Sequence, residues 1–182
     1  MDWLKRAFSS GPALPPSDSP PQLASELIEA EAIAAELVDY LLSDRLFWQL
    51  SVETPLGSQQ PKMTLGGLWE RMKHLEAAAE LGPNDRQRLA AVNTAWEDAR
   101  RRYPPQFSDK LKRELESYLK NWRYFLDQFA RDPERWREEY EVELRNRRRV
   151  ELVLRLLGPD APAGILDDLA ELEAEVSRQV DK

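Results

Sequence analysis

Apolar residues recur along most of this chain at alternating steps of three and four positions, which is the spacing of one face of an α-helix. The most regular run covers 111–129 and steps 4, 3, 4, 3, 4. Together the runs predict five to six helices, over residues 22–50, 64–81, 84–103, around 111–129, over 133–157 and from 164 onward. Because the connections are short, we expect an all-α fold, an antiparallel helical bundle.

Proline, glycine and short polar side chains mark where these helices begin and end. Thr64 and Asp132 stand where N-cap residues belong, and Asn84 with Gln87 has the spacing of a capping box. Residues 51–64 interrupt the helical pattern with two prolines and a glycine, so an irregular loop is the favoured interpretation and a short β-hairpin the alternative.

The front of the chain has a different composition from the rest. Residues 9–21 contain five prolines and four serines, which cannot bury enough apolar surface to order themselves. The sequence therefore predicts a flexible N-terminal tail with a linker at 9–21, followed by a single helical-bundle domain over 22–182.

Residues 1–8 form a short amphipathic peptide ahead of that linker. Trp3, Leu4, Ala7 and Phe8 fall on one face of a helix, but eight residues cannot hold a helix alone in water. The peptide is thus predicted to dock on a partner protein, on this bundle, on a second subunit or on a membrane surface. The alternative is a tail without a docking role.

Composition removes several classes of function. The 182 residues contain no cysteine and a single histidine, which excludes disulfides, thiolate metal sites and a cysteine nucleophile. No apolar run reaches the roughly 20 residues of a membrane-spanning helix, so we expect no transmembrane segment and a cytoplasmic location. The net charge of −7 is uneven, because residues 100–155 carry 16 basic against 11 acidic side chains.

Carboxylates are the remaining candidates for catalysis. The pairs Glu26 with Glu29 and Glu36 with Asp39 resemble the paired motifs of MazG-like pyrophosphatases, a resemblance that implies a magnesium-dependent nucleotide hydrolase. Both pairs lie on one predicted helix, however, where they cannot enclose an ion between them. The only histidine, His74, has no cluster of further ligands in the sequence, so we expect no metal site and no cofactor.

Two arginine clusters suggest nucleic-acid binding as an alternative, because basic side chains beside aromatic ones can hold phosphates and stack bases. Helix-terminal charge and salt bridges within the protein account equally for such clusters, and the acidic net charge favours that account. The basic residues in question are Arg100, Arg101, Arg102, Arg145, Arg148 and Arg149.

The sequence thus favours a non-enzymatic interaction, scaffold or regulatory protein that binds partner proteins through residues 1–8, with a homo-oligomer possible. Nucleic-acid association is the first alternative, and a carboxylate-dependent nucleotide hydrolase is the second.

Overall fold

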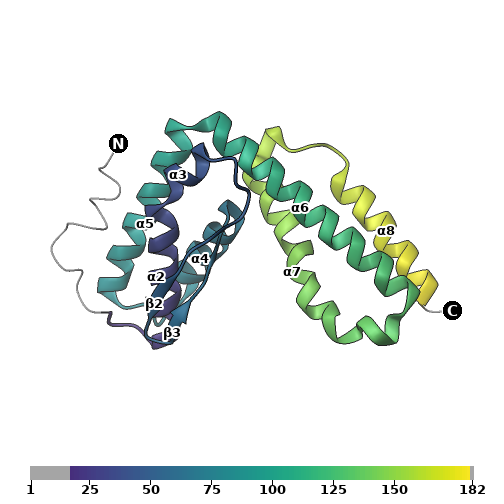
Figure 1. The fold of residues 1–182 in the computed structure, drawn as a ribbon, viewed down its shortest axis with the longest axis horizontal. Coiled ribbons are helices and arrows are strands. Elements are labelled where there is room, and N and C mark those ends of the chain that lie inside the picture. The colour runs from purple at the N-terminus through teal and green to yellow at the C-terminus, as the bar shows by residue number, and fades with distance from the viewer. Residues whose placement is uncertain (1–16, 181–182) are drawn as a thin grey trace. The chain divides into compact units, whose positions relative to one another are not determined.

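The computed structural model describes residues 17–180, and Figure 1 shows that helices make up most of this part of the chain. The predicted all-α fold is confirmed, and the 51–64 region contains the short β-hairpin that was the alternative to an irregular loop. The chain divides into two compact units between Lys110 and Leu111, and each unit is described by itself. That residues 22–182 form a single domain stays a prediction, and the predicted peptide 1–8 lies outside the described residues.

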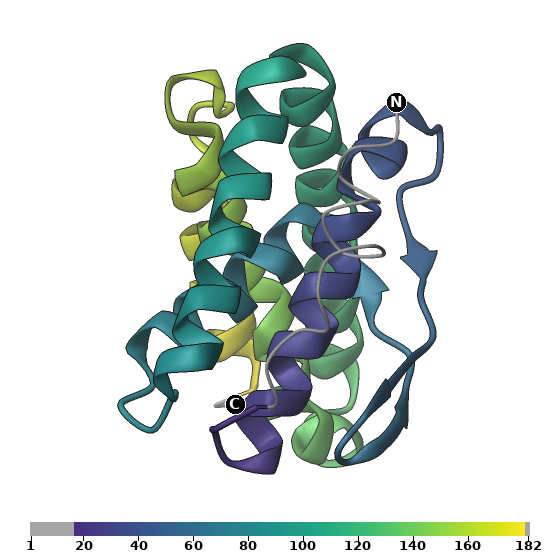
Figure 2. The ribbon, with the colours of Figure 1, turned by 90° about the vertical axis from the view of Figure 1, so that its left-hand side faces the viewer.

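Unit 1 contains a helical core and a β-ribbon. Its elements are α2 (Pro21–Ala35), α3 (Leu37–Leu42), β1 (Trp48–Gln49), β2 (Val52–Thr54), β3 (Gly57–Gln59), β4 (Lys62–Met63), α4 (Leu65–Ala77), α5 (Pro83–Arg102) and the first turns of α6 (Pro104–Arg131). Helix α2 contacts α4, α5 and β2, and Figure 2 shows it as the purple helix beside α5.

The core of unit 1 is aromatic at its centre. Trp96 of α5 is buried. The centroid of its ring lies 4.8 Å from that of Phe107, in an edge-on arrangement, and 5.5 Å from that of Trp69 of α4. Around these rings pack aliphatic side chains on the predicted stripes, among them Leu27 and Leu68. The 3–4 spacing therefore identified the buried faces correctly.

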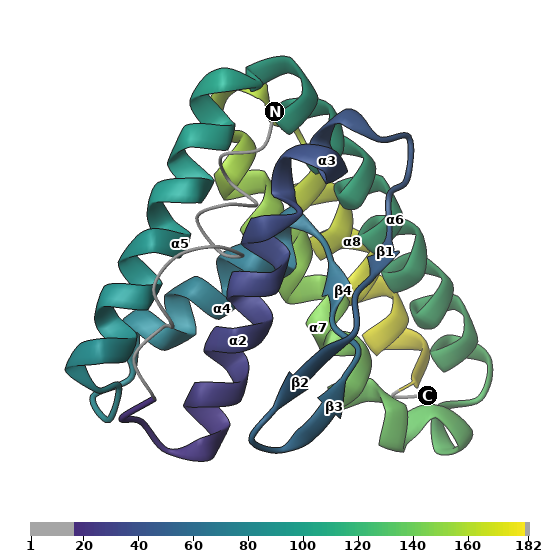
Figure 3. The ribbon, with the colours of Figure 1, turned by 60° about the vertical axis from the view of Figure 1, so that its left-hand side comes forward.

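Three of the four strands of the β-ribbon, β2, β3 and β4, lie in the segment 51–64, so the favoured interpretation of an irregular loop was wrong. Strand β1 lies at the end of the range predicted for the first helix. Strand β2 pairs with β3 and β1 pairs with β4, both antiparallel, as Figure 3 shows. The turn between β2 and β3 closes at Gly57, whose φ of +95° is a conformation that other residues rarely adopt. The Thr54 hydroxyl donates to the Gly57 carbonyl at 2.9 Å and fixes the same turn.

The first helix is shorter than predicted. It is interrupted at Glu36 and ends at Leu42 rather than near position 50, because the following backbone groups bind elsewhere. The buried Lys110 ammonium donates to the carbonyls of Ser43, at 2.8 Å, and of Arg45. The Tyr40 hydroxyl donates to the carbonyl of Leu46 at 2.8 Å, so this connection leads directly into β1.

Unit 2 consists of the rest of α6 with α7 (Pro133–Leu157), the short 3₁₀ helix η1 (Gly158–Asp160) and α8 (Ile165–Val180).

The predicted caps at Thr64 and Asp132 are confirmed, since their side chains accept from the backbone N–H groups of Gly67 and Arg135 at 3.0 and 3.2 Å. The predicted cap at Asn84 is wrong, because α5 already begins at Pro83.

Candidate functional site

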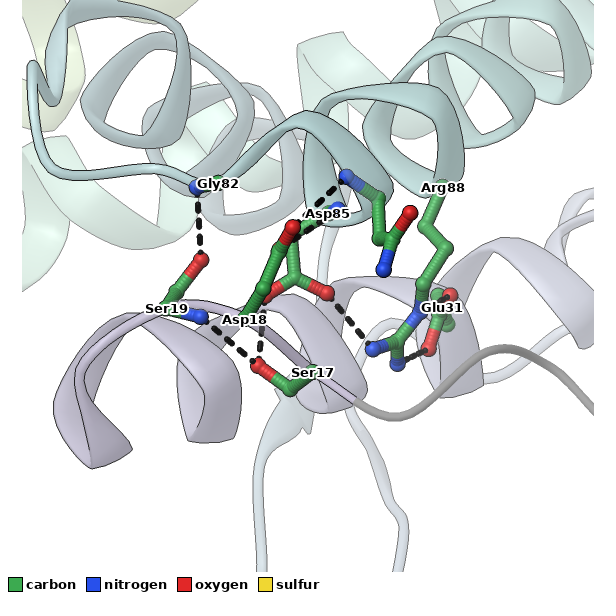
Figure 4. A network of polar contacts seen from close by, with 8 residues as sticks. Ser17, Asp18, Ser19, Glu31, Gly82, Asp85 and Arg88 are labelled. Carbon is green, nitrogen blue, oxygen red and sulfur yellow. Dashed lines mark hydrogen bonds and ion pairs between the residues drawn. The ribbon is translucent and has the colours of Figure 1, made fainter.

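A network of polar contacts joins α2, α5 and the segment before α2 (Figure 4). The Arg88 guanidinium donates through Nε and Nη2 to both oxygens of Glu31, at 2.9 and 2.6 Å, and through Nη1 to Asp85 at 2.8 Å. All three side chains are buried. Asp85 and Arg88 are buried because they share a face of α5 with the buried Val92 and Trp96.

Residues of the segment before α2 complete this network. The Ser17 hydroxyl donates to Asp85 at 2.5 Å, and the Ser19 hydroxyl accepts from the backbone N–H of Gly82 at 2.9 Å. The Asp18 carboxylate accepts from the backbone N–H groups of Asn84 and Asp85 at 3.1 and 3.3 Å. The Asp18 side chain therefore caps the N-terminus of a helix that begins 65 positions later in the sequence.

Gly82 makes this arrangement possible. It is the N-cap position of α5, and its lack of a side chain leaves the first N–H groups of the helix without a local acceptor. A Cβ atom at Gly82 would lie 2.0 Å from the Asp18 Oδ1, so any other residue would displace the carboxylate. We call the whole set the arm anchor, which consists of Ser17, Asp18, Ser19, Glu31, Gly82, Asp85 and Arg88.

The buried acidic and basic groups of the arm anchor hold one another in their ionised forms. Burial alone would raise the pKa of the Asp85 carboxyl, but hydrogen bonds from Ser17 and Ser19 and the neighbouring Arg88 outweigh it, so this pKa lies below its ordinary value. Hydrogen bonds to Glu31 raise the pKa of Arg88 against the opposing effect of burial. Both groups are held in their charged forms.

Removing the cap should have a measurable cost. We expect Asp18→Ala to lower the free energy of unfolding by about 1 kcal/mol, the usual value of a lost N-cap, because two N–H groups of α5 lose their acceptor. Asp18→Asn keeps an acceptor oxygen and should lose less. Urea denaturation followed by circular dichroism measures the difference.

A double variant provides the control. Gly82→Ala should reproduce most of the loss of Asp18→Ala, and combining the two should cost less than their sum, because both remove the same contact. Fully additive losses would contradict the cap assignment.

The lowered pKa of Asp85 predicts acid sensitivity. Its ionisation stabilises the fold above the ordinary pKa of 3.8, and this contribution disappears as the pH falls through the lower pKa of the folded state. Stability measured as a function of pH should therefore fall more steeply below about pH 4 in the wild type than in Asp85→Asn. Equal slopes for Asp85→Asn and the wild type would contradict the prediction.

The predicted docking residues Trp3, Leu4, Ala7 and Phe8 lie outside the described residues. The arm anchor nevertheless holds the chain only nine residues after Phe8, at Ser17. The last part of the predicted 9–21 linker, residues 17–21, is thus bound to α5 or included in α2.

The two arginine clusters lie in different units and differ in their environment. In α5, Arg100 pairs with Glu97 at 3.8 Å and Arg101 pairs with Asp98, while Arg102 is exposed. These pairs agree with the salt-bridge account of the cluster.

The α7 cluster is less neutralised. Arg149 lies over the Tyr118 ring at 5.7 Å, whereas Arg145 and Arg148 are exposed and form no ion pair within the described part of the chain. Arg147 of the same helix donates to Glu173 at 2.6 Å and to Glu151 at 2.8 Å.

The candidate metal-binding carboxylates are engaged in other interactions. Glu26 lies 2.6 Å from the Nδ1 of His74, and Glu29 pairs with Arg71 at 2.8 Å. Across residues 17–180 no group of three or more acidic or histidine side chains is placed to hold a metal ion. The same residues include no helix long and apolar enough to cross a membrane.

A cleft of about 530 Å³ opens in unit 2 among α6, α7 and α8. Its wall is largely aromatic and aliphatic, and Trp122 donates from Nε1 to Glu173 at 2.8 Å on one side of it. The sequence stripes did not include Tyr140 and Leu144, which lie on the α7 side; the spacing of Trp136, Tyr140 and Leu144 at steps of four would have indicated them.

Sequence reasoning also missed the arm anchor, although a signal for it existed. Asp85 and Arg88 fall on the same helical stripe as Val92, and Glu31 falls between the apolar positions 27 and 34 of α2. Charged residues inside an apolar stripe indicate a buried ion pair.

Comparisons of the chain with protein-family models, curated proteins and solved structures found no match.

Proposed function

We propose that this protein is a non-enzymatic interaction protein whose residues 1–8 dock on a partner protein from a fixed base on unit 1. The observation that carries the proposal is the arm anchor. It joins residues 17–19 to α5 through backbone and side-chain hydrogen bonds and a buried guanidinium. The point from which the preceding segment leaves the fold is therefore defined.

The anchor also limits how far the peptide reaches. The sequence suggested a linker of 13 residues, but anchoring at Ser17 leaves only the eight residues 9–16 between the peptide and its base. At 3.3–3.6 Å per residue these span at most about 29 Å. Partners must consequently bind close to unit 1.

The chemistry of the peptide suggests what such a partner offers. Trp3, Leu4, Ala7 and Phe8 would fill an apolar groove, as amphipathic helices do when they bind other proteins. Lys5 and Arg6 occupy the opposite face, where acidic residues on the rim of that groove would complement them.

The test compares the proteins captured by two variants of the full chain. Trp3→Ser combined with Phe8→Ser should lose a specific partner, while Lys5→Gln on the opposite face should retain it. The same partners on both variants would contradict the proposal. Binding of the wild type to anionic vesicles, with the same sensitivity to Trp3 and Phe8, would assign the peptide to a membrane surface instead.

The structure also changes how a truncation should be made. Deleting residues 1–8 leaves the arm anchor intact, whereas a deletion through residue 21 removes the Asp18 cap together with the first residue of α2. A loss of partners after the longer deletion would mix lost docking with lost stability. The shorter deletion is therefore the informative one.

Nucleic-acid association remains the second candidate, and Arg145 and Arg148 favour it, because both are exposed and form no ion pair among residues 17–180. Binding through these side chains should weaken steeply with salt and with the charge reversals Arg145→Glu and Arg148→Glu. The absence of any mobility shift of DNA or RNA at low salt would rule it out.

A further inference from the structure

The solvent-facing side of α7 carries its charges in two blocks. Residues 133–143 contain five glutamates and two arginines, whereas 144–157 contain five arginines and one glutamate. One exposed stripe, at steps 4, 3, 4, 3 and 4, passes through both blocks. Its members are Glu134, Glu138, Glu141, Arg145, Arg148 and the half-buried Leu152.

Four charges of this stripe have no partner inside the described chain. Glu138, Glu141, Arg145 and Arg148 are exposed and form no hydrogen bond or ion pair there, although many other charged side chains do. Of these four, Glu141 also lines the cleft of unit 2. Beside the stripe Val142 has 52% of its surface exposed. Four of the five charges on this stripe of α7 are therefore not neutralised within residues 17–180, and an exposed apolar side chain lies beside them.

The order of these charges is self-complementary. If two copies of α7 run antiparallel and cross at position 143, each residue n lies opposite residue 286 − n of the other copy. Glu141 then meets Arg145 and Glu138 meets Arg148, and two-fold symmetry repeats both pairs. Glu134, which already pairs with Arg137 at 2.8 Å, lies opposite Leu152 and faces no like charge.

We propose that this face of α7 is the contact surface for a second copy of the same chain, in an antiparallel two-fold pair centred on position 143. A second copy is the occupant that charge complementarity favours, because the same face supplies both halves of each ion pair, as an interface around a two-fold axis requires. One helix face offers less area than the 1,200–2,000 Å² buried in a typical stable complex. The dimer is therefore concentration-dependent and weakened by salt.

Charge reversal tests the pairing between Glu138 and Arg148. These positions are ten residues apart on one helix, so they do not contact each other within a chain. Glu138→Arg alone and Arg148→Glu alone each place like charges together and should weaken self-association at least about tenfold. The double variant restores opposite charges and should recover it. Sedimentation velocity over a range of concentrations at low salt measures the association.

Mixing the two single variants provides a second measurement. The Glu138→Arg chain has arginine at both positions 138 and 148, and the Arg148→Glu chain has glutamate at both. Each variant therefore repels a second copy of itself, whereas one chain of each variant forms a complementary pair. We expect a tagged Glu138→Arg chain to retain an untagged Arg148→Glu chain, and not another Glu138→Arg chain. Control reversals at the exposed Arg123 and Glu171, which lie on α6 and α8, should not change the wild-type dimer.

The outcomes separate this interface from a nucleic-acid surface. A polyanion bound by Arg145 and Arg148 would be held more tightly by Glu138→Arg, whereas the dimer is weakened by it. A wild-type chain that stays monomeric at the highest concentration and lowest salt would overturn the proposal. A dimer indifferent to both single reversals would overturn it as well.

Discussion

Replacing Arg88 with alanine should lower the free energy of unfolding of unit 1 by about 3–5 kcal/mol, the cost of breaking a buried ion pair from one side. The side chain is 8% exposed and satisfies Glu31 through two hydrogen bonds and Asp85 through a third. Its removal leaves two carboxylates in the core without a counter-charge. Since domains are stable by only about 5–15 kcal/mol, this single change brings unit 1 close to unfolding.

Two comparisons identify the cause of that loss. Arg100→Ala removes an exposed pair on the same helix and should cost under about 1 kcal/mol. Arg88→Met combined with Glu31→Leu and Asp85→Asn removes the charges together and should cost less than Arg88→Ala, because no charge is then left unpaired. Urea denaturation of Arg88→Ala, Arg100→Ala and the triple variant measures these losses. A loss below about 1 kcal/mol for Arg88→Ala would contradict the prediction and show that the carboxylates of Glu31 and Asp85 reach water.

Trp96→Ala should be comparably severe, at about 3–5 kcal/mol. Trp96 is 1% exposed and its ring packs against those of Phe107 and Trp69, so alanine leaves a cavity among three helices. Trp96→Phe should cost clearly less, because the buried Nε1 of Trp96 has no hydrogen-bond partner among the described residues and phenylalanine removes that unsatisfied donor.

The matched control for Trp96 is an exposed aromatic side chain. Tyr124 of α6 is 65% exposed, and Tyr124→Ala should stay within about 0.5 kcal/mol of the wild type. Thermal and urea denaturation provide the measurements. Equal losses for alanine and phenylalanine at position 96 would contradict the argument from the cavity.

The helices were predictable from the sequence because their signals are local. The stripe from 111 to 129 gave the buried face of α6, and Thr64 and Asp132 gave two N-caps, since each acts within a few residues of itself. Helix α2 was predicted too long because the side chain that binds the backbone beyond α3 is Lys110, some 65 residues away. Nothing in the intervening apolar pattern reports that contact.

The candidate site was less predictable for the same reason. Asp18 stands in a proline- and serine-rich stretch whose composition indicates disorder, yet its carboxylate caps α5 because Gly82 leaves that position open. The composition of a segment predicts whether it is ordered in isolation, but it does not report hydrogen bonds to a helix end that is distant in the sequence. The clusters Arg100–Arg102 and Arg145–Arg149 look alike in sequence and differ only through the partners that the fold supplies.

The capping of α5 by Asp18 also provides a local reporter. The amide protons of Asn84 and Asp85 are bonded only while the Asp18 carboxylate is in place, so their exchange with deuterated solvent measures release of the segment without unfolding of the helix. If a partner that binds residues 1–8 pulls on this segment, these two amides should exchange faster than their neighbours. Two backbone amides can thus report whether residues 17–19 are bound to α5 or released from it.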